Sequence, residues 1–271
     1  MGNFGGMNIR RTMLESPQSL PSVSSCPVLV LAGGLGTRLR AAYDDGPKCL
    51  APVAGRPFLE YLLMWLHAAG IRELILCVGH KRAQVQHWLR DGRHGGLNVR
   101  YCVEKELLGT AGALRLASTM VEAQTCLALN GDSFLDVNLQ EMYRFHQSRR
   151  ALATLALARV RDSGRYGGIQ LDRQGRIKAF SEKRGGCKQP SGEKDAVQLI
   201  NGGVYLLERQ FFGSIPEGRA VSLETESFPA LTGGDIYGFV SSGYFIDIGV
   251  PADYARAQKE LAERFSYDYS S

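Results

Sequence analysis

The sequence lacks the long apolar runs that a membrane span or a secretory signal requires. Among its 271 residues the longest such runs, 26–32 and 74–78, are far shorter than the roughly 20 residues that cross a bilayer. The first 25 residues are rich in Gly, Ser, Pro and Asn and contain no apolar stretch of signal length. We therefore expect a flexible leader over 1–25, a cytoplasmic location and no contact with a membrane.

Closely spaced metal ligands are also missing. None of the six cysteines belongs to a C-x-x-C pair, which argues against a zinc site or a disulfide framework. Several stand in strand-like runs, as Cys77 does in LILCV and Cys126 in TCLALN, where small buried thiols are common. His80 and His87 do not form an H-E-x-x-H motif and are predicted to be surface residues. The pattern favours free thiols in a reducing compartment.

An excess of charge of one sign is absent too. The net charge is only +5, and the basic residues come in pairs rather than in a long stripe with aromatic residues between them. This distribution argues against nucleic-acid binding. Scattered positive charge fits either a site for phosphorylated small molecules or an ordinary solvated surface.

Short apolar runs alternate with amphipathic stretches through the first half of the chain. Strands are predicted at 28–34, 73–80, 97–104 and 125–132. Helices are predicted at 57–70, after the strand 73–80 through Trp88, and beginning at 109–118. This alternation predicts a mostly parallel sheet with helices on both faces.

The second half of the chain has a different, β-rich character. Two alternating runs flank Asp172-Arg173-Gln174-Gly175, which predicts a hairpin. Further strands are predicted at 199–208 and 243–249, and a closing helix at 251–263. The polar stretch 185–195 is predicted to be a loop.

The connection after the first predicted strand, LAGGLGTRLRAAYDDGPKCL, carries the densest chemical signals. Gly33, Gly34 and Gly36 stand where backbone N–H groups can meet phosphate oxygens and where side chains would obstruct them. The dinucleotide pattern G-x-G-x-x-G fails because Leu39 stands at its third glycine, and the P-loop pattern fits nowhere. A tight turn without a ligand would use the same glycines.

Two cations in this connection favour the functional interpretation. Arg38 follows the last glycine by two residues, and Lys48 follows Pro47. Displacement at an α-phosphorus brings one anion onto another, so fixed cations are needed to offset the repulsion. We therefore predict that this connection binds a triphosphate.

LAGGLGTRLR together with PKCLAPVAGRPFLEYLL resembles the signature of sugar-1-phosphate nucleotidylyltransferases. Over residues 27–263 the segments LGTAGAL, LNGDSF, LINGGVYLL and GYFIDIGVPADY most resemble the guanylyltransferases of D-glycero-α-D-manno-heptose 1-phosphate. The resemblance implies an α/β fold with a doubly wound, mostly parallel, Rossmann-like sheet of the nucleotide-diphospho-sugar transferase type. It also implies a single domain over 26–271, with an inserted β-rich sugar-binding region at about 150–210.

The reaction implied by the resemblance joins a nucleoside triphosphate, GTP in the first instance, to a sugar 1-phosphate and releases pyrophosphate. The same reaction with dTTP, UTP or CTP and a hexose 1-phosphate stays open, as does a non-catalytic sugar-nucleotide-binding protein. A glycosyltransferase would use a D-x-D metal motif, but Ser133 and Phe134 follow Asp132. Relatives commonly self-associate, so a homodimer is expected by analogy.

The resemblance assigns catalytic roles to Arg38, Lys48 and Asp132, and it assigns Mg2+ to Asp132 in LNGD and Asp247 in FIDIG. Magnesium bound to phosphates usually takes only one or two protein carboxylates. Asp132 could instead cap a turn, and Asp247, between two isoleucines, needs a partner that an arginine would also supply. The expected nucleotide-binding residues are Leu31, Ala32, Gly33, Gly34, Gly36, Thr37, Arg38, Gly109 and Thr110.

Sugar-phosphate recognition is expected in the second half of the chain. The resemblance implies that Glu182 accepts sugar hydroxyls and that Lys183 meets the sugar phosphate. By their residue types alone, the two could equally form a surface ion pair worth under about 1 kcal/mol. The full expected set is Tyr166, Gly167, Glu182, Lys183, Asn201 and Gly202.

Overall fold

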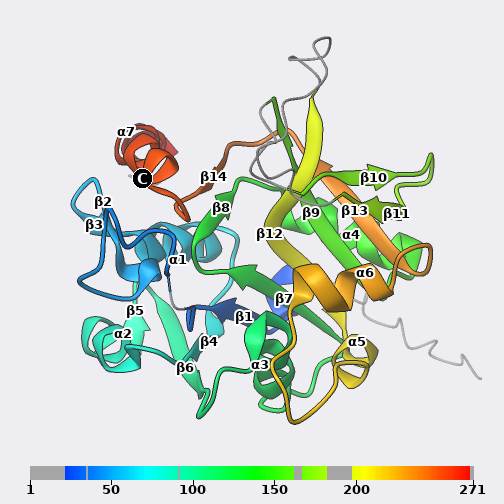
Figure 1. The fold of residues 1–271 in the computed structure, drawn as a ribbon, viewed down its shortest axis with the longest axis horizontal. Helices are drawn as coiled ribbons and strands as arrows, with labels where there is room; N and C mark the ends of the chain where they lie inside the picture. Colours follow the sequence, from blue (N-terminus) through cyan, green and yellow to red (C-terminus); the bar gives the residue numbers. More distant parts are fainter. Residues whose placement is uncertain (1–21, 35, 91, 162–166, 182–196, 269–271) are drawn as a thin grey trace, which may run out of the picture.

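The computed structural model of the protein, shown in Figure 1, is centred on one large mixed sheet. It describes residues 22–34, 36–90, 92–161, 167–181 and 197–268. The order of the eight strands is β13-β9-β12-β7-β1-β4-β6-β5. They are β1 Val28–Leu31, β4 Glu73–Val78, β5 Arg93–His94, β6 Leu97–Val103, β7 Thr125–Asn130, β9 Ala153–Val160, β12 Gln198–Glu208 and β13 Ile236–Ser241.

Strands β7, β1, β4 and β6 run parallel, as the alternation of the first half predicts. The long strand β12 runs antiparallel to both β7 and β9, and it joins the β-rich half to the parallel half. Strand β13 adds a further parallel pair with β9 at one edge. The predicted fold class, a doubly wound and mostly parallel sheet, is confirmed.

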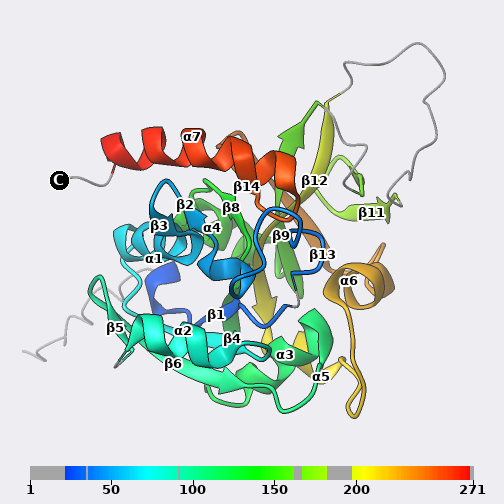
Figure 2. The same ribbon diagram turned by 60° about the vertical axis from the view of Figure 1, so that its left-hand side comes forward.

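Apolar side chains cover both faces of the sheet. One core contains buried residues of α1, α2, α4 and α7, and the other contains those of α3, α5 and α6. Figure 2 shows α3, α5 and α6 at one side of the molecule and α7 with β2 and β3 at the other. The helices are α1 Phe58–Ala68, α2 Arg82–Leu89, α3 Gly109–Ser118, α4 Leu139–Arg149, α5 Arg209–Gly213, α6 Phe228–Ala230 and α7 Pro251–Asp268.

Three small two-stranded sheets complete the fold. The predicted hairpin is present, and Gly175 (φ +82°) makes its turn while Asp172 Oδ1 accepts from the N–H groups of Gln174 and Arg176. The paired strands are β2 Pro52–Val53 with β3 Arg56–Pro57, β8 Ser133–Leu135 with β14 Phe245–Asp247, and β10 Ile169–Leu171 with β11 Ile177–Phe180.

The predicted end of the leader differs from the structure. Residues 1–21 of the predicted leader lie outside the described residues, but Val23 is buried in the core and its N–H donates to the Gln140 side chain at 3.0 Å. The folded part therefore includes residues assigned to the leader.

Helix α4 was not predicted because it is largely polar. Asn138 caps this helix by accepting from the Glu141 N–H at 3.0 Å.

The cysteines agree with the prediction where they are described. Cys26, Cys49, Cys77, Cys102 and Cys126 are buried free thiols, and Cys187 lies outside the described residues. No helix in the described part of the chain has the length and apolar character of a membrane span.

Candidate active site

The carboxyl ends of the parallel strands meet at one edge of the sheet, where open α/β sheets bind ligands. The Ala32 N–H donates to the Cys77 carbonyl at 2.9 Å, and the Gly131 N–H donates to the Leu31 carbonyl at 2.8 Å. A Cβ on Gly131 would overlap that carbonyl, so glycine permits the close approach. Asp132 follows directly and lies beside the predicted nucleotide-binding connection.

Asp132 and Asp247 come together despite their separation in the sequence. Strand β14 pairs with β8 so that Asp247 lies opposite Ser133, and the Ile248 N–H donates to the Asp132 carbonyl at 3.0 Å. Lys48 Nζ lies 2.6 Å from Asp132 Oδ2 and 3.4 Å from Asp247 Oδ1. One cation therefore contacts both carboxylates that the sequence assigned to a metal.

This three-residue cluster is partly shielded from solvent. Lys48 exposes 10% of its side chain, Asp247 23% and Asp132 40%. Burial and then the negative charge of Asp132 raise the pKa of Asp247, while Lys48, the Gly249 N–H at 2.7 Å and Arg38 act against that rise. Lys48 is thus a partner of Asp247 in the structure, while its role at phosphate stays a prediction.

The glycine loop, defined as residues 33–34 and 36–48, borders a pocket of about 260 Å³. Gly36 has φ +61°, and a Cβ there would lie 3.4 Å from the Lys48 Cβ. His80 and Lys81, from the connection between β4 and α2, also line the pocket. The Lys81 Nζ donates to the Asp44 carbonyl at 2.8 Å and so ties the loop to α2.

Five predicted residues of this loop and of β1 are thereby located at the same edge. Leu31 ends β1, and Thr37 and Arg38 are exposed on the loop. The positive charge of Arg38 acts on the pKa of Asp247, against the rise that burial causes. Gly34, like Gly36, lines the pocket.

Glu104, directly after β6, is a carboxylate that the sequence argument missed. It is half-buried, and a Cβ built on Gly33 would lie 2.7 Å from its Oε1. The Leu108 N–H donates to its Oε2 at 3.3 Å. Burial raises the pKa of Glu104, and no cation in the described part of the chain acts on it. An acidic residue at the end of a predicted strand, as for Asp132, was the available signal.

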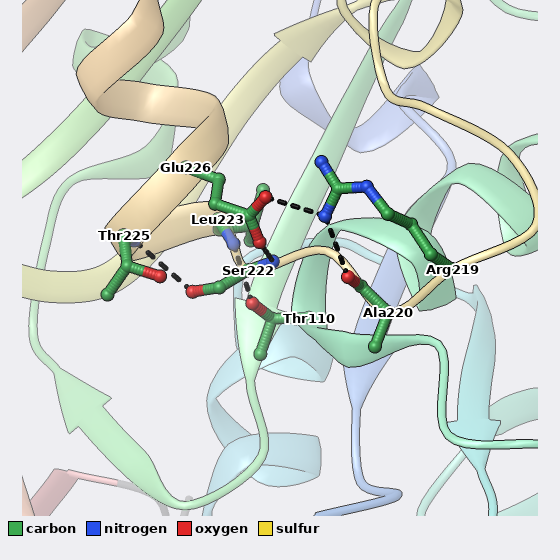
Figure 3. Close-up of polar contacts among 7 residues, drawn as sticks. All are labelled: Thr110, Arg219, Ala220, Ser222, Leu223, Thr225 and Glu226. Carbon is green, nitrogen blue, oxygen red and sulfur yellow. Dashed lines mark hydrogen bonds and ion pairs between the residues drawn. The ribbon is translucent and has the colours of Figure 1, made fainter.

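Gly109 and Thr110 begin α3 at the same edge of the sheet. Gly109 has φ +72°, and a Cβ there would overlap the Val221 carbonyl. The Thr110 hydroxyl accepts from the Leu223 N–H at 2.8 Å, as Figure 3 shows, and donates to Glu224 Oε2 at 3.0 Å. The Thr110 side chain therefore faces the 221–224 segment.

The predicted sugar-phosphate residues are described in part. Gly168 forms a bridge with Ile200, which brings Gly167 beside the β12 residues Asn201 and Gly202. Tyr166, Glu182 and Lys183 lie outside the described residues.

The side chain of Asn201 is engaged within its own strand. Its Nδ2 donates to the Tyr205 hydroxyl and its Oδ1 accepts from the Gly203 N–H, both at 2.9 Å. A Cβ on Gly202 would overlap the Leu135 side chain, so this glycine allows β12 to pack against β8. Strand β12 thus joins the expected sugar side to the Asp132 region.

Residues 27–264 match the nucleotidyl transferase family. The chain belongs to this family. A mannose-1-phosphate guanylyltransferase of Mycobacterium tuberculosis is 39% identical over 236 residues, which are 86% of this chain and 64% of that protein. A D-glycero-alpha-D-manno-heptose 1-phosphate guanylyltransferase of Aneurinibacillus thermoaerophilus is 36% identical over 234 residues, which are 86% of this chain and 97% of that protein.

The solved structures agree with the family match. HddC from Yersinia pseudotuberculosis, crystallised in complex with GMP-PN, has a TM-score of 0.74 and 29% sequence identity. The similarity covers 87% of this nucleotidyl transferase family member and 99% of HddC. The resemblance to sugar-1-phosphate nucleotidylyltransferases and the predicted enzyme class are therefore confirmed.

Proposed function

We propose that this protein transfers GMP from GTP to D-glycero-α-D-manno-heptose 1-phosphate, with release of pyrophosphate and formation of a GDP-sugar. The observation that carries the transfer is the contact of Lys48 with both Asp132 and Asp247 beside the glycine loop. This arrangement gathers cationic and metal-binding groups at the sheet edge where a triphosphate would lie.

The donor set fits Mg2+ bound together with a nucleotide. Mg2+ that is also bound to phosphates usually takes only one or two protein carboxylates, and Asp132 and Asp247 would supply two. Asn130 Oδ1 and Ser133 Oγ, on either side of Asp132, are buried without a hydrogen-bond partner in the same part of the chain. When bound, Mg2+ supplies neutralisation of phosphate charge and orientation of the α-phosphorus.

The residues of the chain supply the remaining electrostatics. The phosphate oxygen of the sugar phosphate is already ionised and attacks the α-phosphorus in line, and the bond to the bridging oxygen of pyrophosphate breaks. Arg38 and Lys48 offset the negative charge of the two substrates. Lys48 offsets the charge of Asp132 and Asp247 and, from the end of the glycine loop, would also meet a phosphate group.

Glu104 supports the choice of guanine. An ionised carboxylate only accepts hydrogen bonds, and guanine presents two adjacent donors, N1–H and the N2 amino group, on one edge. Adenine, cytosine and uracil each place at least one acceptor on the corresponding edge. A carboxylate against Gly33, without a cationic partner in the described chain, therefore complements guanine and disfavours the other bases.

The choice of a heptose rests on the relatives. The heptose-phosphate guanylyltransferase matches along 97% of its length, whereas the chain spans 64% of the mannose-phosphate enzyme. Mannose 1-phosphate is the second acceptor because the enzyme that uses it has the higher identity, 39%.

Pyrophosphate release with purified protein and Mg2+ tests this proposal. GTP, UTP, dTTP and CTP are each assayed with the 1-phosphates of D-glycero-α-D-manno-heptose, mannose and glucose. We expect the highest kcat/KM for GTP with the heptose phosphate. A higher value for UTP or dTTP would overturn the guanine assignment, and a higher value for mannose 1-phosphate would overturn the heptose assignment.

A further inference from the structure

The segment from Arg219 to Ser227, called here the α3 brace, closes over the start of α3. Its Val221 N–H donates to the Leu108 carbonyl at 2.8 Å, and its Val221 carbonyl accepts from the Ala111 N–H at 2.9 Å. Gly109 lies between these two bonds, where only a glycine avoids the Val221 carbonyl. The backbone at the helix start is therefore held directly against the brace.

Thr110 is held by the brace through its side chain as well. Its hydroxyl accepts from the Leu223 N–H at 2.8 Å and donates to Glu224 Oε2 at 3.0 Å. The Ser222 hydroxyl donates to the same Glu224 oxygen at 3.1 Å. Figure 3 shows Thr110 directed toward Leu223 from the first turn of the helix. Glu224 Oε2 thus accepts from two hydroxyl groups, one on α3 and one on the brace.

These bonds leave part of the helix start open to a ligand. The first amides of an α-helix have no acceptor within the helix. The Ala111 amide is taken by Val221, whereas the amides of Gly109 and Thr110 donate to no described residue. Both belong to the predicted nucleotide-binding set, so their direction determines how a nucleotide would be held.

The negative charge of Glu224 also acts on a buried side chain of β12. Burial and then the negative charge of Glu224 raise the pKa of Tyr205, a fully buried residue of β12. The Tyr205 hydroxyl accepts from Asn201 Nδ2 at 2.9 Å. Glu224 thus contacts the start of α3, and its charge also acts on the strand that carries Asn201 and Gly202.

We propose that Glu224 is a positioning residue for the nucleotide, because it fixes the Thr110 hydroxyl and thereby the direction of the first amides of α3. This inference rests on the proposed function for the identity of the nucleotide. Glu224 itself does not contact the reacting atoms in this assignment. Its effect is on binding of GTP, in the ground state and the transition state alike.

Steady-state kinetics and calorimetric GTP binding test the inference with the variants Thr110→Val and Glu224→Ala. Each should raise the KM and the Kd for GTP about tenfold, the effect of one lost hydrogen bond in a polar contact. The kcat and the KM for the sugar phosphate should change less than about twofold. The effects of the two substitutions should be less than multiplicative in the double variant, because both remove the hydrogen bond between Thr110 and Glu224.

Conservative variants separate positioning from folding. Thr110→Ser keeps the hydroxyl and Glu224→Gln keeps an accepting oxygen, so both should return the KM for GTP to near the wild-type value. Failure of both to do so, with thermal unfolding unchanged, would overturn the inference.

Glu226→Ala is the matched control in the same brace. Glu226 Oε2 accepts from Arg219 Nη1 at 2.7 Å and its Oε1 accepts from the Ser222 N–H at 3.2 Å, without a contact to Thr110. It should leave the KM for GTP unchanged, and an equal rise in Glu226→Ala and Glu224→Ala would overturn the inference. If the wild-type protein forms no GDP-sugar, the proposed function is overturned but this inference is not. The inference is then decided by whether Thr110→Val raises the Kd for GTP.

Discussion

Lys48 Nζ lies 2.6 Å from Asp132 Oδ2 and reaches Asp247 from the same position, so a loop lysine joins two carboxylates from separate parts of the chain. The three residues come from the glycine loop, from the end of β7 and from β14. Each carboxylate would repel the other without a cation between them. Lys48 therefore offsets the repulsion between the two carboxylates.

Lys48→Met should separate the structural and catalytic effects of this lysine. Removing a cation at a reacting phosphate typically lowers kcat/KM about 100-fold or more. The unpaired aspartates should also lower the melting temperature in EDTA, and Mg2+ should raise it more in this variant than in the wild type. The exposed Lys259→Met is the matched control. Equal Mg2+ shifts in all three proteins would contradict the arrangement.

Asp247→Asn should remove turnover while preserving the fold. The amide oxygen of asparagine can still accept the Gly249 N–H that Asp247 Oδ1 accepts at 2.7 Å. Loss of one metal-binding charge should reduce Mg2+-dependent kcat about 100-fold, measured by pyrophosphate release, with an unchanged circular dichroism spectrum. Wild-type turnover that persists in excess chelator would count against the metal assignment.

Glu104→Gln should weaken the selection of guanine. A glutamine presents one acceptor and one donor where the carboxylate presents acceptors only, so one of the two guanine donors loses its partner. We expect kcat/KM for GTP to fall about 10- to 100-fold and that for UTP to stay constant or rise. Inosine triphosphate, which lacks the N2 amino group, gives the matched substrate control. An unchanged ratio of GTP to inosine triphosphate would refute the role of Glu104.

The sheet edge could be predicted from sequence because each of its signals is local. An apolar run that ends in Gly33, or one that ends in Asp132, identifies both a strand and the residue that follows it. Parallel strands then bring those residues to one edge. The same rule applied to the strand 97–104 selects Glu104.

Contacts between distant segments could not be predicted in this way. The contact of Asp247 with Lys48 depends on the path of the glycine loop through space. The number of residues in the loop does not determine that path. The α3 brace carries no recognisable motif, so the sequence did not connect Glu224 with Thr110. Asn201 stays a predicted sugar-phosphate residue, and its hydrogen bond to Tyr205, next to a register shift in β12, could not be predicted from the sequence.

A buried histidine lies at the opposite end of the sheet from this site. His146 is 1% exposed, its Nδ1 lies 2.8 Å from Thr154 Oγ1, and its Nε2 lies 3.0 Å from Glu208 Oε1. Thr125, at the start of β7, donates to the same Glu208 oxygen at 2.6 Å. Burial lowers the pKa of His146 below its ordinary 6.5, although Glu208 acts in the opposite direction.

His146→Gln should reduce the loss of stability in mild acid. Because the pKa of His146 is lower in the folded state, the unfolded chain takes up the proton first. The contribution of His146 is therefore complete above about pH 6.5 and is lost as the pH falls. The free energy of unfolding in urea should drop less in the variant than in the wild type between about pH 7.5 and 5.5. If the free energies of unfolding of the variant and the wild type fall in parallel with pH, another group controls the acid sensitivity. The kcat at pH 7.5 should be unchanged because His146 is remote from Asp132.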